Sequence, residues 1–384
     1  MRIMANEGPL VLRKPYINEF RGLDILRFVL SFAVVIWHYQ HFFYPFVPFS
    51  SREIFLDKQP YFRYLSFFYT EGLYAVHMFW FISGIIFTKI YRPKISSHQI
   101  ELLSYFENRY SRLYPLHLFM LLVVVVLQEL YFRQNQTFFI YQDNSMKAFF
   151  QNLLYVQSWG SNKFSFNGPT WSVSIEILVY LTFYVCAAAG LLKSLKSQVF
   201  FFLFFLILKK WELVFVSEDI VTCFYFFFAG GLFLEVFNRI KDKPIWITVS
   251  LIATALALML TLYTPAKIDH VFQVATGRLD ADILLFTILV TLSFLVLFKH
   301  RSFDWIPNKY FQFLGNMTYS MYLIHFPIQL TIYLLYRPKS YDMFLSTSFF
   351  FMYFIALFLL ARIVYTYFEL PVQNYIRKNY NVAK

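Results

Sequence analysis

The sequence predicts an all-α integral membrane protein, a bundle of about ten transmembrane helices with both termini in the cytoplasm. Hydrophobic residues make up 59% of the 384 residues and charged residues only 15%, whereas soluble domains average about half apolar and a quarter charged. The mean hydropathy is +0.52. The apolar residues gather in runs of spanning length, which is about 20 residues for a hydrocarbon core of about 30 Å. We therefore expect one membrane domain that fills the chain.

Ten apolar runs are expected to span the membrane. They lie at 22–42, 67–90, 113–131, 170–191, 198–210, 220–237, 245–264, 281–298, 317–336 and 344–367. Aromatic side chains crowd the ends of these runs, as is typical of residues at headgroup depth. We expect residues 1–20 to form a cytoplasmic N-terminal segment, 21–368 the transmembrane core and 369–384 a cytoplasmic tail.

The distribution of Lys and Arg predicts the orientation. With an even number of spans both termini share a side, and that side carries 20 of the 34 Lys and Arg residues against 12 on the other. Positive charge concentrates in cytoplasmic loops, so the termini are expected there. The net charge of +12 follows from these residues at the membrane edges, and we predict no nucleic-acid partner. Cys186 and Cys223 lie singly in apolar runs, which predicts neither a disulfide framework nor a metal site.

The first apolar run carries ionisable side chains. In "RGLDILRFVLSFAVVIWH" Arg27 and His38 are 11 residues apart, about 20° from three full helical turns, so both leave the same helix face about 16 Å apart. Such residues usually face a protein interior and mark a functional path, although a snorkelling arginine and a packed histidine are the structural alternative. Asp24, three residues before Arg27, can pair with it and lower the cost of both charges.

Paired arginines stand at the start of the third run. In "ENRYSRLYPL" Arg109 and Arg112 are three residues apart and are expected to project together. Two guanidinium groups on one face match phosphate oxygens, while ordinary positive charge at a membrane edge is the alternative. His117 is interpreted as a packing residue.

The stretch "FNGPTWSVSIEILVYL" holds a carboxylate in an apolar helix. Asn167, Gly168 and Pro169 are expected to form a turn before this helix. Glu176 follows within its first two turns, where an unpaired carboxylate costs several kcal/mol. Glu176 is predicted either to pair with an arginine of another helix or to act beside an imidazole or an acceptor hydroxyl. Trp171 fits the site or an interfacial anchor.

The ninth run carries a further group of polar side chains. In "LGNMTYSMYLIHFPI" Ser320, Tyr322 and His325 fall on adjacent faces. His325 is expected about one turn inside the cytoplasmic end of this run. A satisfied core histidine is the alternative interpretation of His325.

These stretches together resemble acyltransferase family 3, the integral membrane O-acyltransferases that modify lipopolysaccharide, exopolysaccharide, peptidoglycan and some small molecules. The matching stretches are "RGLDILRFVLSFAVVIWH", "HMFWFISGIIFT", "ENRYSRLYPL", "GPTWSVSIEILVYL" and "LGNMTYSMYLIHFPI", in the family's order over residues 21 to 328. One departure is the single acidic residue Glu176, where the family often has two adjacent ones. The extracytoplasmic SGNH-type esterase-like domain of some members is not expected.

The resemblance implies a function and roles for these residues. An acyl group, most commonly acetyl, would move from cytoplasmic acyl-CoA to a hydroxyl of a cell-surface glycan or its lipid-linked precursor, in the cytoplasmic (inner) membrane of a bacterium. Acyl-CoA would be a substrate, and no permanently bound cofactor is implied. Arg27, Arg109 and Arg112 would hold the CoA phosphates. His38 would be catalytic, as a general base or as an acyl carrier. Independently of the resemblance, we predict that Glu176 orients the His38 ring if its helix packs beside the first, since Asp24 is about 21 Å from His38 along the helix. The residues expected to support the site, on the acceptor side, are Asp24, Asn167, Trp171, Ser172, Tyr322 and His325.

Two other classes of protein also place charges inside membranes. A transporter or flippase of a lipid-linked saccharide would use them along its path, but no inverted repeat or paired broken helices are visible in the sequence. A polysaccharide polymerase or ligase usually needs a large extracytoplasmic loop. Consumption of acyl-CoA distinguishes an acyltransferase from both.

Overall fold

The computed structural model describes residues 21–47, 56–160, 164–211, 216–240, 243, 245–246, 248–252, 290–293 and 305–382. Regular structure in these residues is helical, as the sequence predicts. The main helices are α1 (Arg21–His38), α2 (Phe62–Glu71), α3 (Tyr74–Ile86), α4 (Arg92–Ser96), α5 (Leu102–Asn135), α6 (Met146–Leu153), α7 (Trp171–Ala188), α8 (Leu195–Trp211), α9 (Glu218–Ile240), α13 (Asn308–Tyr336), α14 (Asp342–Leu345), α15 (Thr347–Val364) and α16 (Leu370–Val382). The 3-10 turns η2 (Tyr39–Phe42), η4 (Leu56–Lys58) and η6 (Gly168–Thr170) and the π-helices η5 (Phe87–Tyr91) and η8 (Tyr365–Glu369) connect or extend them.

Six helical segments of the described chain are long and apolar enough to cross a membrane. They are Arg21–Phe42, Tyr74–Ser96, Leu102–Asn135, Gly168–Ala188, Glu218–Ile240 and Thr347–Asn379. Each overlaps a predicted span, and α8 and α13 overlap two more, although neither belongs to these six. The segment 1–20 and most of the predicted spans 245–264 and 281–298 lie outside the described residues.

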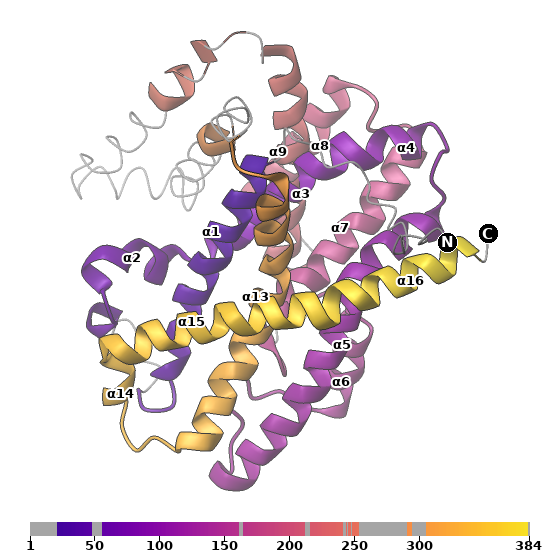
Figure 1. The fold of residues 1–384 in the computed structure, drawn as a ribbon. Coiled ribbons are helices and arrows are strands. Elements are labelled where there is room, and N and C mark those ends of the chain that lie inside the picture. Colours follow the sequence, from indigo (N-terminus) through magenta and orange to yellow (C-terminus); the bar gives the residue numbers. More distant parts are fainter. Residues whose placement is uncertain are drawn as a thin grey trace, which may run out of the picture.

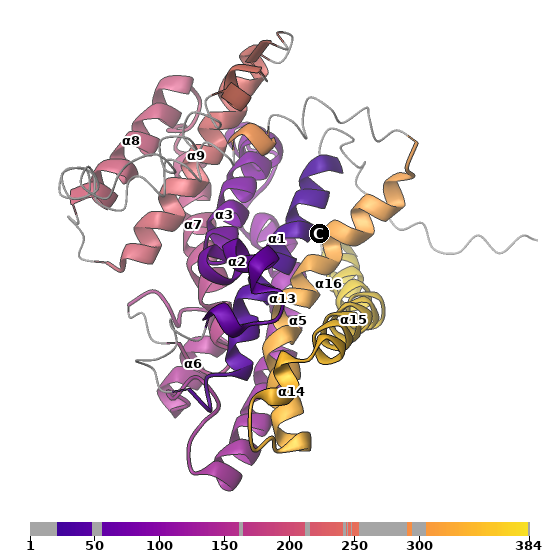
Figure 2. The same cartoon turned by 90° about the vertical axis from the view of Figure 1, so that its left-hand side faces the viewer.

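Two helix pairs dominate the arrangement. Helix α1 packs along α13, and α3 packs along α9. Figure 2 shows α8 and α9 on one side of α1 and α3, with α15 on the other. Helices α15 and α16 are joined through η8 into one long helix that crosses α13 and α5 (Figure 1). The predicted tail 369–384 is therefore helical from Leu370 to Val382, because η8 continues the last span without a break.

Glycines let α3 and α9 approach closely. A Cβ at Gly84 would lie 1.9 Å from the carbonyl oxygen of Phe227, and one at Gly230 would lie 2.0 Å from that of Phe81. In lipid, no hydrophobic driving force holds two helices together. Small residues at a helix crossing allow close backbone packing, which stabilises the pair instead.

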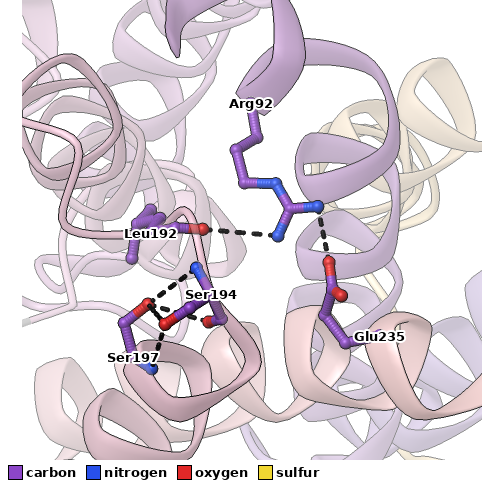
Figure 3. A network of polar contacts seen from close by, with 5 residues as sticks. All are labelled: Arg92, Leu192, Ser194, Ser197 and Glu235. Carbon is purple, nitrogen blue, oxygen red and sulfur yellow. Dashed lines mark hydrogen bonds and ion pairs between the residues drawn. The ribbon is translucent and has the colours of Figure 1, made fainter.

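A polar network fixes the end of this helix pair (Figure 3). Arg92, the first residue of α4, lies 2.5 Å from the carboxylate of Glu235 on α9 and donates to the carbonyl of Leu192, 3.4 Å away. In the same figure Ser194 and Ser197 bond to each other at the start of α8. The ion pair holds the start of α4 against α9. The π-helix η5, which joins α3 to α4, is therefore anchored to α9 at both of its ends.

Candidate active site

The site begins with His38, the last residue of α1. Its side chain is buried, and its Nδ1 lies 3.0 Å from the carbonyl oxygen of Val34. A carbonyl can only accept a hydrogen bond, so Nδ1 carries the ring proton. The Nε2 atom therefore keeps its lone pair, which is the form needed for a base or a nucleophile.

A second histidine lies beside it. The rings of His38 and His325 have centroids 4.8 Å apart. His325 also donates from Nδ1, to the carbonyl oxygen of Tyr322 at 2.6 Å. Its Nε2 is buried and has no hydrogen-bond partner among the described residues. His325 lies near the middle of α13, 17 residues after Asn308. It is not one turn inside the end, because even the predicted run begins eight residues before it, which is about two turns.

The sequence interpretation missed His41 and Gln329. The His41 ring centroid lies 4.9 Å from that of His38. Gln329 donates to the backbone carbonyl of His38 at 2.8 Å, so its Oε1 can accept from Nδ1 of His41, 3.1 Å away. Nε2 of His41 then accepts from the hydroxyl of Tyr141, at 3.3 Å. The signal that could have found them is helical spacing, since His41 follows His38 by three residues and Gln329 follows His325 by four.

The turn η6 connects this histidine cluster (His38, His41 and His325) to α7. The hydroxyl of Tyr322 donates to the carbonyl of Pro169 and accepts from Ser172, 2.8 Å away. Asn167 donates to the carbonyl of Leu323 at 3.0 Å. Three predicted supporting residues, Asn167, Ser172 and Tyr322, thus join the turn to the helix that carries His325.

Trp171, the first residue of α7, is buried among other aromatic side chains. Its side chain is 7% exposed and packs edge-on against Trp80, with ring centroids 5.8 Å apart. The ring centroid of Phe164 lies 6.1 Å from that of Trp171, also edge-on.

Three arginines lie toward the other end of α1. Arg27 reaches Asp24 at 3.4 Å, which is the pair expected from their spacing. Arg109 lies over the rings of Phe87 and Tyr91, with its guanidinium carbon 4.2 and 4.6 Å from their centroids. Cation–π contact of this kind stabilises a guanidinium without neutralising it.

The charge of this arginine cluster (Arg27, Arg109 and Arg112) is incompletely matched. Arg112 is close enough to Arg27 to repel it electrostatically. Nε of Arg109 and Nη2 of Arg112 are buried and have no hydrogen-bond partner in the part of the chain that the structure describes. Buried N–H groups without partners are costly, and an anion is the ligand that satisfies them.

Glu176 belongs to the arginine cluster and not to the histidines. Its Oε1 accepts from Ser83 and from Tyr180, each at 2.5 Å, and it attracts Arg27 and Arg109. Of the two alternatives for Glu176, these contacts favour pairing with the arginines of other helices over orienting the ring of His38. Glu176 lies more than one turn beyond the residues of α7 that reach α13, which carries it toward the arginines.

Glu369 is a second buried carboxylate, at the position where the cytoplasmic tail was predicted to begin. Glu369 closes the π-helix η8, is 3% exposed, and accepts from Ser320 at 2.5 Å. It attracts Arg112 and Arg27. The sequence feature that could have identified Glu369 as a site residue is its position as a lone acidic residue just after the last apolar run. Both π-helices, η5 beneath Arg109 and η8 beside Arg112, lie at the arginine cluster, as single π-turns often do at functional sites.

The arginine cluster and the histidine cluster lie at two different depths along α1, which contributes one residue to each. Arg27 and His38 lie on the same face of α1, about 16 Å apart along its axis. The first cluster can bind a phosphorylated anion, and the second can accept a proton or an acyl group.

Comparison with known proteins agrees with this chemistry. The sequence model of acyltransferase family 3, described as an acyltransferase domain, matches residues 20–366. No curated protein and no solved structure matches the chain. The matched range covers both clusters and most of the chain. The chain therefore belongs to acyltransferase family 3, as a membrane acyltransferase with several membrane-spanning helices.

Proposed function

We propose that this protein moves an acyl group, most simply acetyl, from cytoplasmic acyl-CoA to a hydroxyl of a cell-surface glycan or its lipid-linked precursor. The arginine cluster holds the CoA phosphates, and His38 acts on the thioester as a general base or as an acyl carrier. The end of the bundle that bears the arginines faces the cytoplasm, where acyl-CoA is found. The membrane is the cytoplasmic membrane of a bacterium.

One observation carries this proposal. Among the residues that the structure describes, Arg109 and Arg112 have buried guanidinium nitrogens without hydrogen-bond partners, and an imidazole with a free lone pair lies about 16 Å from Arg27 along α1. Acyl-CoA has the matching shape, since phosphates stand at one end, a thioester at the other, and an extended pantetheine arm lies between them. A transporter for a lipid-linked saccharide would not need an imidazole lone pair at the end of such a path.

The residues of the chain divide the work between binding and chemistry. Arg27 and Arg112 offer charge to the phosphates, while Arg109 offers a flat, oriented guanidinium. Glu176 and Glu369 keep the cluster from repelling itself when no anion is present. In the base mechanism, Nε2 of His38 takes the acceptor hydroxyl's proton as its oxygen attacks the thioester carbon, and the proton then passes to the departing sulfur.

The test uses purified protein in nanodiscs with radiolabelled acetyl-CoA and a membrane lipid and glycan extract. Wild-type protein is expected to transfer label to the extract, and His38→Ala to lose the transfer. The double variant Arg109→Ala/Arg112→Ala should weaken it mainly through KM. Arg133→Ala is the matched control, because Arg133 is exposed and pairs with Glu129, also exposed, at 2.8 Å.

The outcome separates this function from transport. Full activity of His38→Ala would remove His38 from the chemistry. No acetyl-CoA binding and no label transfer by the wild type would reject the acyltransferase proposal in favour of transport.

A further inference from the structure

His38 and His325 present the same chemistry to each other. Each donates from Nδ1 to a backbone carbonyl, that of Val34 or Tyr322, so each keeps a lone pair on Nε2. The two ring centroids are 4.8 Å apart. A general-base mechanism uses one of these lone pairs and leaves the other, on a fully buried ring, without a task.

The second lone pair is needed if His38 carries the acyl group. Once Nε2 of His38 is acylated it has no lone pair, and its Nδ1–H is held by Val34. The acceptor hydroxyl must then lose its proton to another base. His41 is a poor candidate because Gln329 and Tyr141 occupy both of its ring nitrogens.

The carboxylates are no better placed. Glu176 is engaged by Ser83 and Tyr180 beside the arginines. Glu369 is engaged by Ser320 and attracted to Arg112. Within the described residues, Nε2 of His325 remains as the base beside the acylated ring.

We propose that His38 is the acyl carrier and that His325 is the base that activates the acceptor hydroxyl in the second half of the reaction. This inference rests on the proposed function and chooses between the two mechanisms that it leaves open. It also gives His325 a part in the chemistry.

The steps balance as follows. Nε2 of His38 bonds to the acyl carbon, the carbon–sulfur bond breaks, and its electron pair leaves with the CoA thiolate. The acceptor oxygen then bonds to the acyl carbon, the carbon–nitrogen bond breaks, and its electron pair returns to Nε2 of His38. The hydroxyl proton goes to Nε2 of His325 and from there to water, while the released thiolate takes a proton from water. The products are the ester and CoA thiol, and both histidines end in their starting forms.

The charge of the pair stays constant through the second half. Acylated His38 with its Nδ1–H is a cation while His325 is neutral. When the acyl group leaves, His38 becomes neutral as His325 takes the proton. Two cations with ring centroids 4.8 Å apart in a low-dielectric interior would repel strongly, and this sequence avoids that state.

The experiment separates the two halves of the reaction. Protein in nanodiscs is mixed with acetyl-CoA labelled in the acetyl group, first without an acceptor and then with the membrane extract. Released CoA thiol and protein-bound label are measured. The chains compared are wild type, His38→Gln, His325→Gln, His325→Asn and His117→Gln. His117 is the matched control, since it is buried, contacts the carbonyl of Asn152 at 2.8 Å and lies against Tyr155 outside the histidine cluster.

The wild type and His117→Gln are expected to release one equivalent of CoA without acceptor and to retain the label. His38→Gln should do neither. His325→Gln and His325→Asn should keep this first burst while steady transfer to the extract falls about 100-fold or more. Hydroxylamine attacks an acyl-imidazole without a protein base, so it should release the retained label from both His325 variants as acetohydroxamate.

Three results would overturn the inference. The first is normal transfer by both His325 variants. The second is loss of the burst in both variants while they still bind acetyl-CoA. The third is a wild type that releases no CoA without acceptor yet transfers with it, which would make His38 a base and leave the proposed function standing. A wild type that neither releases CoA nor transfers label rejects the proposed function itself.

Discussion

Gly315 on α13 lies directly against Asp24 on α1, so closely that a Cβ at position 315 would stand 2.3 Å from Oδ1 of Asp24 and 2.8 Å from its Cβ. This contact lies between the two helices that carry His38 and His325. Asp24 is also the partner of Arg27. The glycine therefore sets the spacing of the helix pair on which both clusters depend.

Gly315→Ala is expected to lower the free energy of unfolding by about 1–3 kcal/mol, because the added methyl group forces α1 and α13 apart. The shift of Asp24 away from Arg27 should also raise KM for the acyl donor. Thermal unfolding in detergent and donor titration measure the two effects. Gly160→Ala is the control, since a Cβ at Gly160 meets no atom of the described residues within 4 Å. Equal unfolding temperatures for the two variants would mean that this contact does not determine the helix spacing.

Arg109→Lys keeps the charge of the arginine cluster but should raise KM for acetyl-CoA by about tenfold. The guanidinium carbon lies 4.2 Å from the ring centroid of Phe87 and 4.6 Å from that of Tyr91. An ammonium group offers neither the planar face for such contacts nor the fork of N–H donors of a guanidinium. Initial rates at varied acetyl-CoA concentration measure the effect, with Lys94→Arg as an exchange outside this cluster. An unchanged KM would show that position 109 supplies charge alone.

Glu176→Gln distinguishes a catalytic carboxylate from a counter-charge. Gln keeps an Oε1 acceptor for Ser83 and Tyr180 but removes the charge that attracts Arg27. We expect KM for acetyl-CoA to fall about threefold and kcat to stay within about threefold, because the more positive cluster binds phosphates better. Steady-state kinetics measure both, and Glu129→Gln, at an exposed ion pair, is the control. A loss of kcat of about 100-fold would return Glu176 to the chemistry.

Tyr141→Phe removes the hydroxyl that donates to His41 and should cost about 1 kcal/mol of stability at neutral pH. Burial, with the nearby Tyr44 and Tyr322, raises the pKa of Tyr141 well above its ordinary value. The contribution of the hydroxyl is thus fully present below about pH 10, the pKa in the unfolded chain, and is lost as pH rises above it.

The difference in unfolding temperature between wild type and Tyr141→Phe is therefore expected to shrink between neutral pH and pH values above about 10. Calorimetry in detergent across this range measures the difference between the two proteins, in which the titration of the other tyrosines cancels. A difference that stays constant with pH would mean that Tyr141 ionises equally in the folded and unfolded chains.

The local sequence pattern predicted the positions of the helices well, but it predicted poorly which side chains contact each other between helices. The spacing of Asp24 and Arg27 predicted their contact correctly, because residues three apart on a helix always face the same way. His41 and Gln329 were missed because periodicity does not state which polar side chains meet. Only the contacts of Gln329 with the His41 ring and with the backbone carbonyl of His38 give them a role. Glu369 was placed in a tail because the apolar run ends just before it, although the helix continues.

The sequence by itself determined that this is a helical membrane protein, since apolar runs of spanning length are stable as helices in a bilayer. It also determined that Arg27 and His38 share a face of α1, which follows from helical periodicity alone. Only the tertiary structure decided that His38 meets His325 and that Glu176 meets the arginines. Periodicity states which way a side chain points, but its partner depends on which helix packs there, and that choice is made by long-range contacts such as Gly315 against Asp24.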